Sequence, residues 1–203
     1  MVTRYSDARL PTPHGESRIV VYRTGDLAGP GASALGLGPE EHVAMVMGDV
    51  TGESVLARVH SSCYTGEVLG SLRCDCRAQL DAALARIAVE GRGVVVYLVQ
   101  EGRGIGLGNK IRAYDLQDHG KDTVEANLEL GLAADGRSYD VAAQILRELG
   151  ATSVRLMTNN PDKIAGLVAA GMPVHAHESH WVAATKDSES YLDTKKAKLG
   201  HLA

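Results

Sequence analysis

Several features are missing from this sequence. It contains no phenylalanine, a single tryptophan and no apolar run long enough to cross a bilayer, since a membrane-spanning helix needs about 20 consecutive apolar residues. It also lacks a basic-then-apolar leader, which marks exported chains. We therefore expect no membrane partner and a cytoplasmic location.

A surplus of positive charge is missing as well. The 203 residues carry 21 Lys and Arg against 25 Asp and Glu, which gives a formal net charge of -4. General nucleic-acid binders usually show a basic excess, so we predict no nucleic-acid partner. A polyanionic small ligand is compatible with this charge, because a few Arg and Lys residues at one site outweigh a modest global charge.

Apolar periodicity predicts a mixed α/β fold, with antiparallel strands at the N-terminus and then alternating strands and helices around a mixed sheet. The antiparallel strands are expected at 18–23, 42–47 and 55–60, because these three apolar runs follow one another. The further elements expected are strands at 94–99 and 154–157, and helices from Leu80 to Gly91, at 109–119, at 139–149 and from Asn160-Pro161, with Asn160 as N-cap.

Two stretches lack such periodicity. Residues 25–39, rich in Gly, Pro and Ala, predict a flexible surface loop, and residues 173–190 predict an irregular segment. An amphipathic stretch then runs from Tyr191 to the C-terminus. No linker separates independent units, so we expect one domain over residues 1–203.

Only three cysteines are present, and Cys63, Cys74 and Cys76 lie close together. In a reducing compartment an odd number indicates metal binding or redox chemistry rather than disulfides. A catalytic zinc uses three protein ligands and leaves its fourth position to water. Residues two apart share a side only in an extended chain, so Cys74 and Cys76 are expected in an extended turn before the helix that carries Leu80.

Other interpretations of this cluster remain open. The cysteines are alternatively small buried apolar side chains. A structural zinc is a second alternative, and it would need a fourth ligand, for which His60 and His119 are candidates. The spacing of His175, His177 and His180 predicts either another metal group or ordinary surface histidines.

A glycine-rich loop, QEGRGIGLGNK (100–110), follows the apolar run at 94–99. Its glycines allow a ligand to approach the backbone, and the N–H groups of the next helix favour an anion. Neither the G-x-G-x-x-G nor the Walker pattern fits this loop. Basic residues near the ends of elements would suit a triphosphate, because Arg pairs with phosphate oxygens through two hydrogen bonds. They are Arg58, Arg103, Lys110, Arg112, Arg137 and Lys163.

Five stretches together resemble one family over nearly the whole chain. They are RVHSSCYTGEVLGSLRCDC (58–76), EGRGIGLGNKIRAYDLQDHGKDTVEANLELG (101–131), AADGR (133–137), RLMTNNPDK (155–163) and YLDTKKAKLGH (191–201). The sequence is similar to GTP cyclohydrolase II, which begins riboflavin synthesis. The resemblance implies hydrolysis of GTP that opens the guanine imidazole ring, releases formate and pyrophosphate, and leaves 2,5-diamino-6-(5-phosphoribosylamino)pyrimidin-4(3H)-one.

The resemblance also implies cofactors, an assembly and site residues. One Zn²⁺ per chain, Mg²⁺ with the triphosphate, and a homodimer are expected. The zinc ligands would be Cys63, Cys74 and Cys76. The catalytic residues would be Tyr114 near the guanine ring, Asp135 as base and Arg137 at the phosphate, where charge stabilisation suits a permanently protonated guanidinium better than nucleophilic attack. The nucleotide contacts would be Arg58, Val59, His60, Ser61, Ser62, Gln79, Glu101, Gly102, Arg103, Thr123, Thr158 and Lys163.

Two residues beside the cysteines depart from the family pattern, Ser62 before Cys63 and Arg77, which replaces a small residue after Cys76. Ser62 stands where the family usually has Glu, and such neighbours of a metal change its affinity or activity by about 10–100-fold. Two alternative functions follow: a paralogue that stops at the formylated pyrimidine, or a non-catalytic zinc-stabilised GTP-binding protein. An ordinary surface ion pair is likewise the alternative for Asp135 and Arg137.

Overall fold

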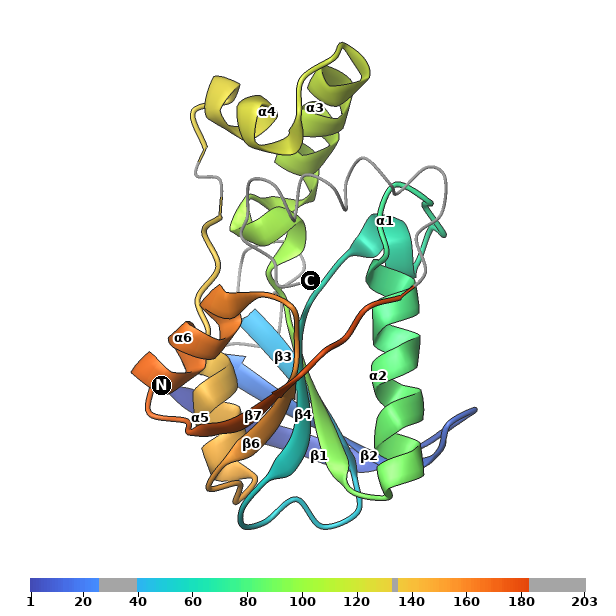
Figure 1. The fold of residues 1–203 in the computed structure, drawn as a ribbon, viewed down its shortest axis with the longest axis vertical. Helices are drawn as coiled ribbons and strands as arrows, with labels where there is room; N and C mark the ends of the chain where they lie inside the picture. Colours follow the sequence, from blue (N-terminus) through green and yellow to red (C-terminus); the bar gives the residue numbers. More distant parts are fainter. Residues whose placement is uncertain (26–39, 133–134, 183–203) are drawn as a thin grey trace.

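The structure, a computed structural model, describes residues 1–25, 40–132 and 135–182. In this part of the chain seven strands form a mixed sheet in the order β1-β2-β3-β5-β4-β6-β7 (Figure 1). The strands are β1 (Val2–Thr12), β2 (Gly15–Thr24), β3 (Glu40–Met47), β4 (Val55–Ser61), β5 (Gly93–Leu98), β6 (Val154–Met157) and β7 (Val174–Glu178). The mixed α/β prediction is confirmed.

The direction of the strands changes in the middle of the sheet. Strands β1, β2 and β3 pair antiparallel, and β3 pairs antiparallel with β5. Strand β4, however, pairs parallel with both β5 and β6. The expectation that residues 55–60 extend the antiparallel run is therefore wrong. The long helix α2 (Cys76–Glu90) between β4 and β5 is the kind of crossover that returns a chain parallel to itself.

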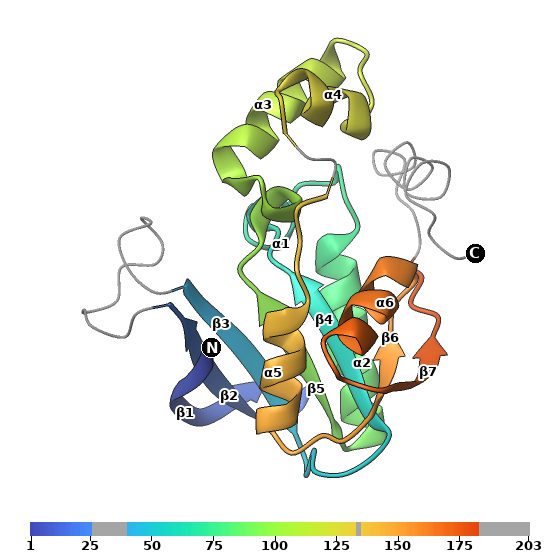
Figure 2. The same ribbon diagram turned by 90° about the vertical axis from the view of Figure 1, so that its left-hand side faces the viewer.

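Helices cover both faces of the sheet (Figure 2). On one face α5 (Asp140–Glu148) and α6 (Pro161–Ala169) contribute Ala142, Ile145 and Leu167 to the larger apolar core. On the other face Leu84 and Ile87 of α2 belong to a second core with strand residues. Strand β4 is accordingly buried on both sides from Val55 to His60, as expected for a central parallel strand.

Local signals set several helix boundaries. Helix α2 ends at Gly91, whose φ of 72° is the left-handed conformation that glycine adopts readily. The Asn160 side chain accepts from the Asp162 N–H (2.9 Å), and Pro161 is the first helical residue, so the predicted N-cap is confirmed. The helices predicted at 109–119 and 139–149 correspond to α3 (Gly106–Asp118) and α5.

The segment predicted to be irregular contains strand β7, which pairs parallel with β6 at the edge of the sheet. The prediction for 173–190 is therefore wrong at 174–178, because pairing to a neighbour, which the sequence does not show, stabilises this short polar strand. The sequence patterns do not predict four further elements: β1, α1 (Tyr64–Glu67), the short 3-10 helix η2 (Glu101–Gly104) and α4 (Thr123–Glu129). Residues 26–39 and 183–203, which include most of the expected loop and the last amphipathic stretch, lie outside the described residues.

The carboxyl ends of β4, β5 and β6 meet at one edge of the sheet. The chain leaves these strands at residues 62–63, 99–103 and 158–163, and helices α3 and α4 project beyond the same edge (Figure 1). In open sheets with parallel strands, ligands bind at such an edge. In the described residues no helix has both the length and the apolarity needed to cross a membrane.

Candidate metal centre and adjacent cavity

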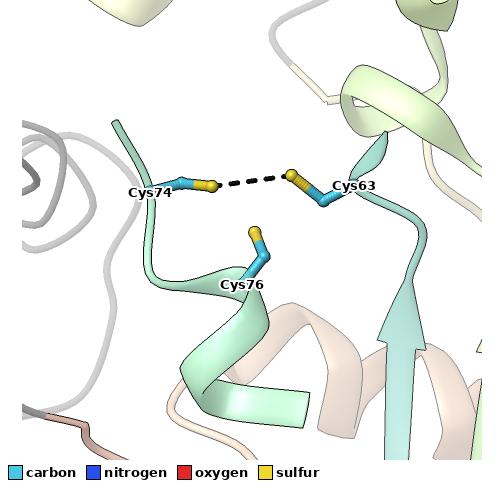
Figure 3. A group of neighbouring side chains, drawn as sticks. All are labelled: Cys63, Cys74 and Cys76. Atoms are coloured by element: carbon cyan, nitrogen blue, oxygen red, sulfur yellow. Dashed lines mark hydrogen bonds between the residues drawn. The ribbon is translucent and has the colours of Figure 1, made fainter. Parts of the chain in front are cut away.

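The three cysteines converge at this edge (Figure 3). Cys63 follows β4, Cys74 lies in the turn before α2, and Cys76 is the first residue of α2. Their Sγ atoms all lie within 4.8 Å of one another, with 3.5 Å between Cys63 and Cys74. Cys74 therefore lies before the helix, as expected, whereas Cys76 already belongs to the helix.

The donor set and its surroundings fit a metal ion. Thiolates are ligands that zinc prefers. A Cβ on Gly66 would lie 2.8 Å from Cys74 Sγ and 3.3 Å from Cys63 Sγ, so the absence of a side chain there keeps room for the sulfurs. Among the described residues the group contains no fourth His, Cys, Asp or Glu ligand. His60 lies against Glu67 instead, and the His119 side chain is 75% exposed.

A lysine adjoins the sulfur cluster. Lys110 Nζ donates to Cys63 Sγ (3.1 Å) and to Glu101 Oε1 (2.8 Å). Hydrogen bonds with Cys74 and Cys76, together with the charge of Lys110, lower the pKa of Cys63. Hydrogen bonding with Cys63 raises the pKa of both Cys74 and Cys76. The cluster therefore favours its first thiolate at Cys63.

A cavity of about 610 Å³ lies beside the cysteines, a size typical of small-molecule sites. Among the described residues seven basic side chains line it, against two acidic ones, Asp118 and Asp122. Such an excess favours a polyanion. The basic residues are Arg58, Arg73, Arg103, Lys110, Lys121, Arg137 and Lys163.

Two of these cations are buried and fixed by the fold. Arg58 donates to the Met157 carbonyl oxygen (2.8 Å) and to Gln79 Oε1. Burial lowers its pKa to about 10, so it stays charged at neutral pH. Lys163 donates to the Val59 carbonyl oxygen (2.9 Å). The ends of β4 and β6 are thus tied together beneath the cavity.

The glycine-rich loop and the AADGR segment meet at the cavity. Gly136 N donates to the Arg103 carbonyl oxygen (3.1 Å). Gly104 has a φ of 90°, and a Cβ there would approach the Gly136 carbonyl oxygen to 3.2 Å. The Asp135 carboxylate accepts hydrogen bonds from Nε and Nη2 of Arg137. The ion pair is present, and Arg137 lines the cavity, whereas Asp135 is not among the lining residues.

Tyr114 of α3 lines the cavity close to the cysteines. Its hydroxyl lies 3.5 Å from Thr65 Oγ1, and the guanidinium of Arg73 lies 4.8 Å from the centre of its ring. Burial raises the pKa of Tyr114. The phenol therefore keeps its proton at neutral pH and is able to donate a hydrogen bond into the cavity.

Some of the expected nucleotide contacts line the cavity, and the others are not among its lining residues. Val59 points into the core, Glu101 holds Lys110, and the Thr158 side chain accepts from the Asn160 N–H (3.0 Å). Thr123 begins α4, and its side chain lies outside the described part. The expected residues that line the cavity are Arg58, His60, Ser61, Ser62, Gln79, Gly102, Arg103 and Lys163.

Several residues of this region were missed from sequence. Glu67, from the unanticipated helix α1, lies 2.7 Å from His60 Nε2 and accepts from the Tyr97 hydroxyl (2.5 Å). No sequence signal marks Glu67 or Tyr97, because the two residues are distant along the chain and meet only in the folded protein. Glu67 and Tyr97 are not among the residues that line the cavity. Residues that do line it and were not predicted as contacts include Arg73, Asn159, Asn160, His180 and Trp181.

The three C-terminal histidines do not act together. His175 and His177 are exposed on β7, whereas His180 is 3% exposed and belongs to the cavity wall. The His180 Nε2–H donates to the Gln79 carbonyl oxygen (2.8 Å). They form no metal group within the described residues. The surface interpretation is confirmed for the first two and wrong for His180.

The fold and the site together define a class of α/β protein in which three cysteines able to hold a metal ion border a basic, nucleotide-sized cavity. The family follows from comparison. The sequence model of the GTP cyclohydrolase II family matches residues 3–179. The chain therefore belongs to the GTP cyclohydrolase II family.

Curated relatives are identical to this chain at about half of the aligned positions. The riboflavin biosynthesis protein RibBA of Salinispora tropica is 53% identical over 199 residues, covering 97% of this chain and 47% of the relative. RibBA of Bacillus cereus strain ATCC 14579 is 51% identical over 203 residues, covering 100% and 48%. The chain spans about half the length of the curated relatives it matches.

A solved structure is more distant. RibBX, a two-domain 3,4-dihydroxy-2-butanone 4-phosphate synthase from A. baumannii, is 19% identical, with a TM-score of 0.45 over 90% of this chain and 40% of that one. A likeness at this level is too weak to establish a shared fold.

Proposed function

We propose that the chain catalyses zinc-dependent hydrolysis of GTP in riboflavin biosynthesis, opening the imidazole ring of guanine with release of formate and pyrophosphate. The observation that carries the proposal is the tri-cysteine group at the edge of a cavity that seven basic side chains of the described residues line, in a member of this family. A triphosphate needs several such cations, and the ring needs an activated water.

The reacting end of the purine would lie at Cys63, Cys74 and Cys76, which would hold the zinc ion. When bound, zinc supplies a water of lowered pKa and polarises the carbon under attack. Tyr114 lies beside this group with its proton retained. It would donate a hydrogen bond to the ring nitrogen that gains charge as the ring opens.

The triphosphate would lie against the loops after β5 and before α5. Arg103 and Arg137 approach the cavity from these two loops, which the Gly136–Arg103 backbone hydrogen bond joins. Asp135 holds Arg137 through paired hydrogen bonds, so its role here is to orient a phosphate-binding guanidinium. Mg²⁺ bound with the triphosphate would supply further charge neutralisation as pyrophosphate leaves.

Arg58, which is buried, and its half-buried partner Gln79 would form the rest of the purine-binding part of the cavity. Gln79 accepts from Arg58 and donates through Nε2 to Asp75 Oδ2 (2.5 Å). Because Arg58 and Asp75 both hold the Gln79 side chain, its polar atoms keep a fixed arrangement. Such preorganisation lowers the entropy lost when substrate binds.

Product analysis tests the proposal. The purified zinc-loaded protein is incubated with GTP and magnesium, and formate and pyrophosphate are quantified. Release of both supports the proposal, whereas pyrophosphate alone indicates a reaction that stops at the formylated pyrimidine. Tight GTP binding without either product indicates a non-catalytic binding protein and overturns the enzymatic proposal. Cys74→Ser is expected to abolish formate release, and unchanged release would refute the catalytic metal site.

A further inference from the structure

Lys110 contacts the sulfur cluster from an element that supplies no cysteine. It projects from α3, while Cys63 follows β4 and the other two cysteines belong to the start of α2. Its Nζ lies 3.1 Å from Cys63 Sγ, within range for an N–H···S hydrogen bond. The Lys110 side chain is 13% exposed, so solvent screens this contact little.

Lys110 is itself held in place by Glu101. Lys110 Nζ donates to Glu101 Oε1 (2.8 Å), and the Glu101 side chain is 14% exposed. The same carboxylate accepts from the backbone N–H groups of Tyr64 (2.7 Å) and Gly102 (3.0 Å). The ammonium is thus fixed relative to α1, to the glycine-rich loop and to the cysteines.

We infer that Lys110 is a positioning residue of the metal centre: it donates a hydrogen bond to the Cys63 thiolate, with Glu101 as its orienting partner, and thereby strengthens metal binding. This inference rests on the proposed zinc site. Three thiolates around a divalent cation leave one excess negative charge, and a fixed cation at one sulfur offsets part of it. Partners of this kind change metal affinity by about 10–100-fold.

Metal affinity, measured without substrate, tests the inference. Zinc dissociation constants are obtained by competition with a chromophoric chelator for the wild type, Lys110→Met and Lys110→Arg. Lys110→Met is expected to weaken zinc binding by about 10–100-fold. Lys110→Arg, which keeps the charge and an N–H donor, is expected to recover most of the loss. Arg112→Met removes a charge from the same helix without touching a cysteine, and should leave the constant unchanged.

A spectroscopic measurement separates this hydrogen bond from a general effect on folding. In the cobalt-substituted protein the sulfur-to-metal charge-transfer band should move to longer wavelength in Lys110→Met, because the sulfur loses its hydrogen-bond donor. If that variant fails to fold, Glu101→Gln is measured instead, with a smaller shift and a smaller loss of affinity expected.

The failures are distinguishable. Wild-type affinity and an unshifted band in Lys110→Met would overturn this inference and leave the proposed function intact. A wild-type protein that binds no zinc would overturn the metal centre and this inference together.

Discussion

At the scale of single residues, Gly66 shows how closely the metal centre is packed. The position that a Cβ would occupy lies within contact distance of two sulfurs, although Gly66 is itself no ligand. Its conformation is not the reason for glycine, since its φ is not among the positive values. Glycine is needed because the sulfur atoms of Cys63 and Cys74 lie too close to leave room for a side chain.

We therefore predict that Gly66→Ala impairs metal binding. The new methyl group would displace Cys74 Sγ, and zinc affinity should fall at least about tenfold, by analogy with other changes next to metal ligands. Zinc content after dialysis against a chelator measures the effect. Gly108→Ala is the matched control, because a Cβ there meets nothing within 4 Å. Full zinc retention in Gly66→Ala would contradict this account of the glycine.

A second residue-scale prediction concerns the buried carboxylate of Glu67, whose side chain is 7% exposed. Glu67→Leu would leave the hydrogen-bonding groups of His60 and Tyr97 unpaired, and should lower the free energy of unfolding by about 3 kcal/mol. Tyr97→Phe removes one hydrogen bond and should cost about 1 kcal/mol. Urea denaturation measures both, and equal stabilities of the two variants would argue against a shared acceptor.

At the scale of elements, capping and periodicity explain why some predictions succeed. Asn160-Pro161 and Gly91 mark helix ends through interactions within a few residues, so the sequence alone predicts them. Strand β7 offers no such local signal. Its residues alternate between half-buried and exposed, and its identity as a strand depends on pairing with β6.

The cap of α6 gives an element-scale prediction. Asn160→Ala removes the acceptor for the Asp162 N–H and should destabilise the protein by about 1 kcal/mol. Asn160→Ser retains a capping oxygen and should recover most of that stability. Thermal unfolding of the two variants measures the difference. Identical melting temperatures for Ala and Ser would show that the cap contributes nothing.

At the scale of the whole molecule, His180 links the end of β7 to α2 and to the turn before α6. Its backbone N–H donates to Asn159 Oδ1 (2.8 Å) and its ring to the Gln79 carbonyl oxygen. Burial, followed by the positive charge of Arg58, lowers the pKa of His180 to about 4. The folded protein therefore holds this ring neutral where an unfolded chain would protonate it.

This depressed pKa predicts acid sensitivity. The unfolded state binds the extra proton once the pH falls below about 6.5, so stability is complete above that pH and decreases towards pH 4. Wild type should lose about 2 kcal/mol more than His180→Gln between pH 7 and pH 5. Urea denaturation at the two pH values measures this difference. Parallel losses in both proteins would contradict a neutral buried His180.

By itself the sequence determined the candidate metal ligands, the family resemblance and most helices, because each depends on residue type and short spacing. Cys63, Cys74 and Cys76 form a group by their spacing alone, and the structure brings their sulfurs together. Only the tertiary structure decided that β4 runs parallel to its neighbours, that Lys110 contacts Cys63, that Glu67 pairs with Tyr97 and that His180 lines the cavity beside Gln79. Those contacts join residues distant along the chain, and local propensity carries no information about which long-range partner a side chain meets.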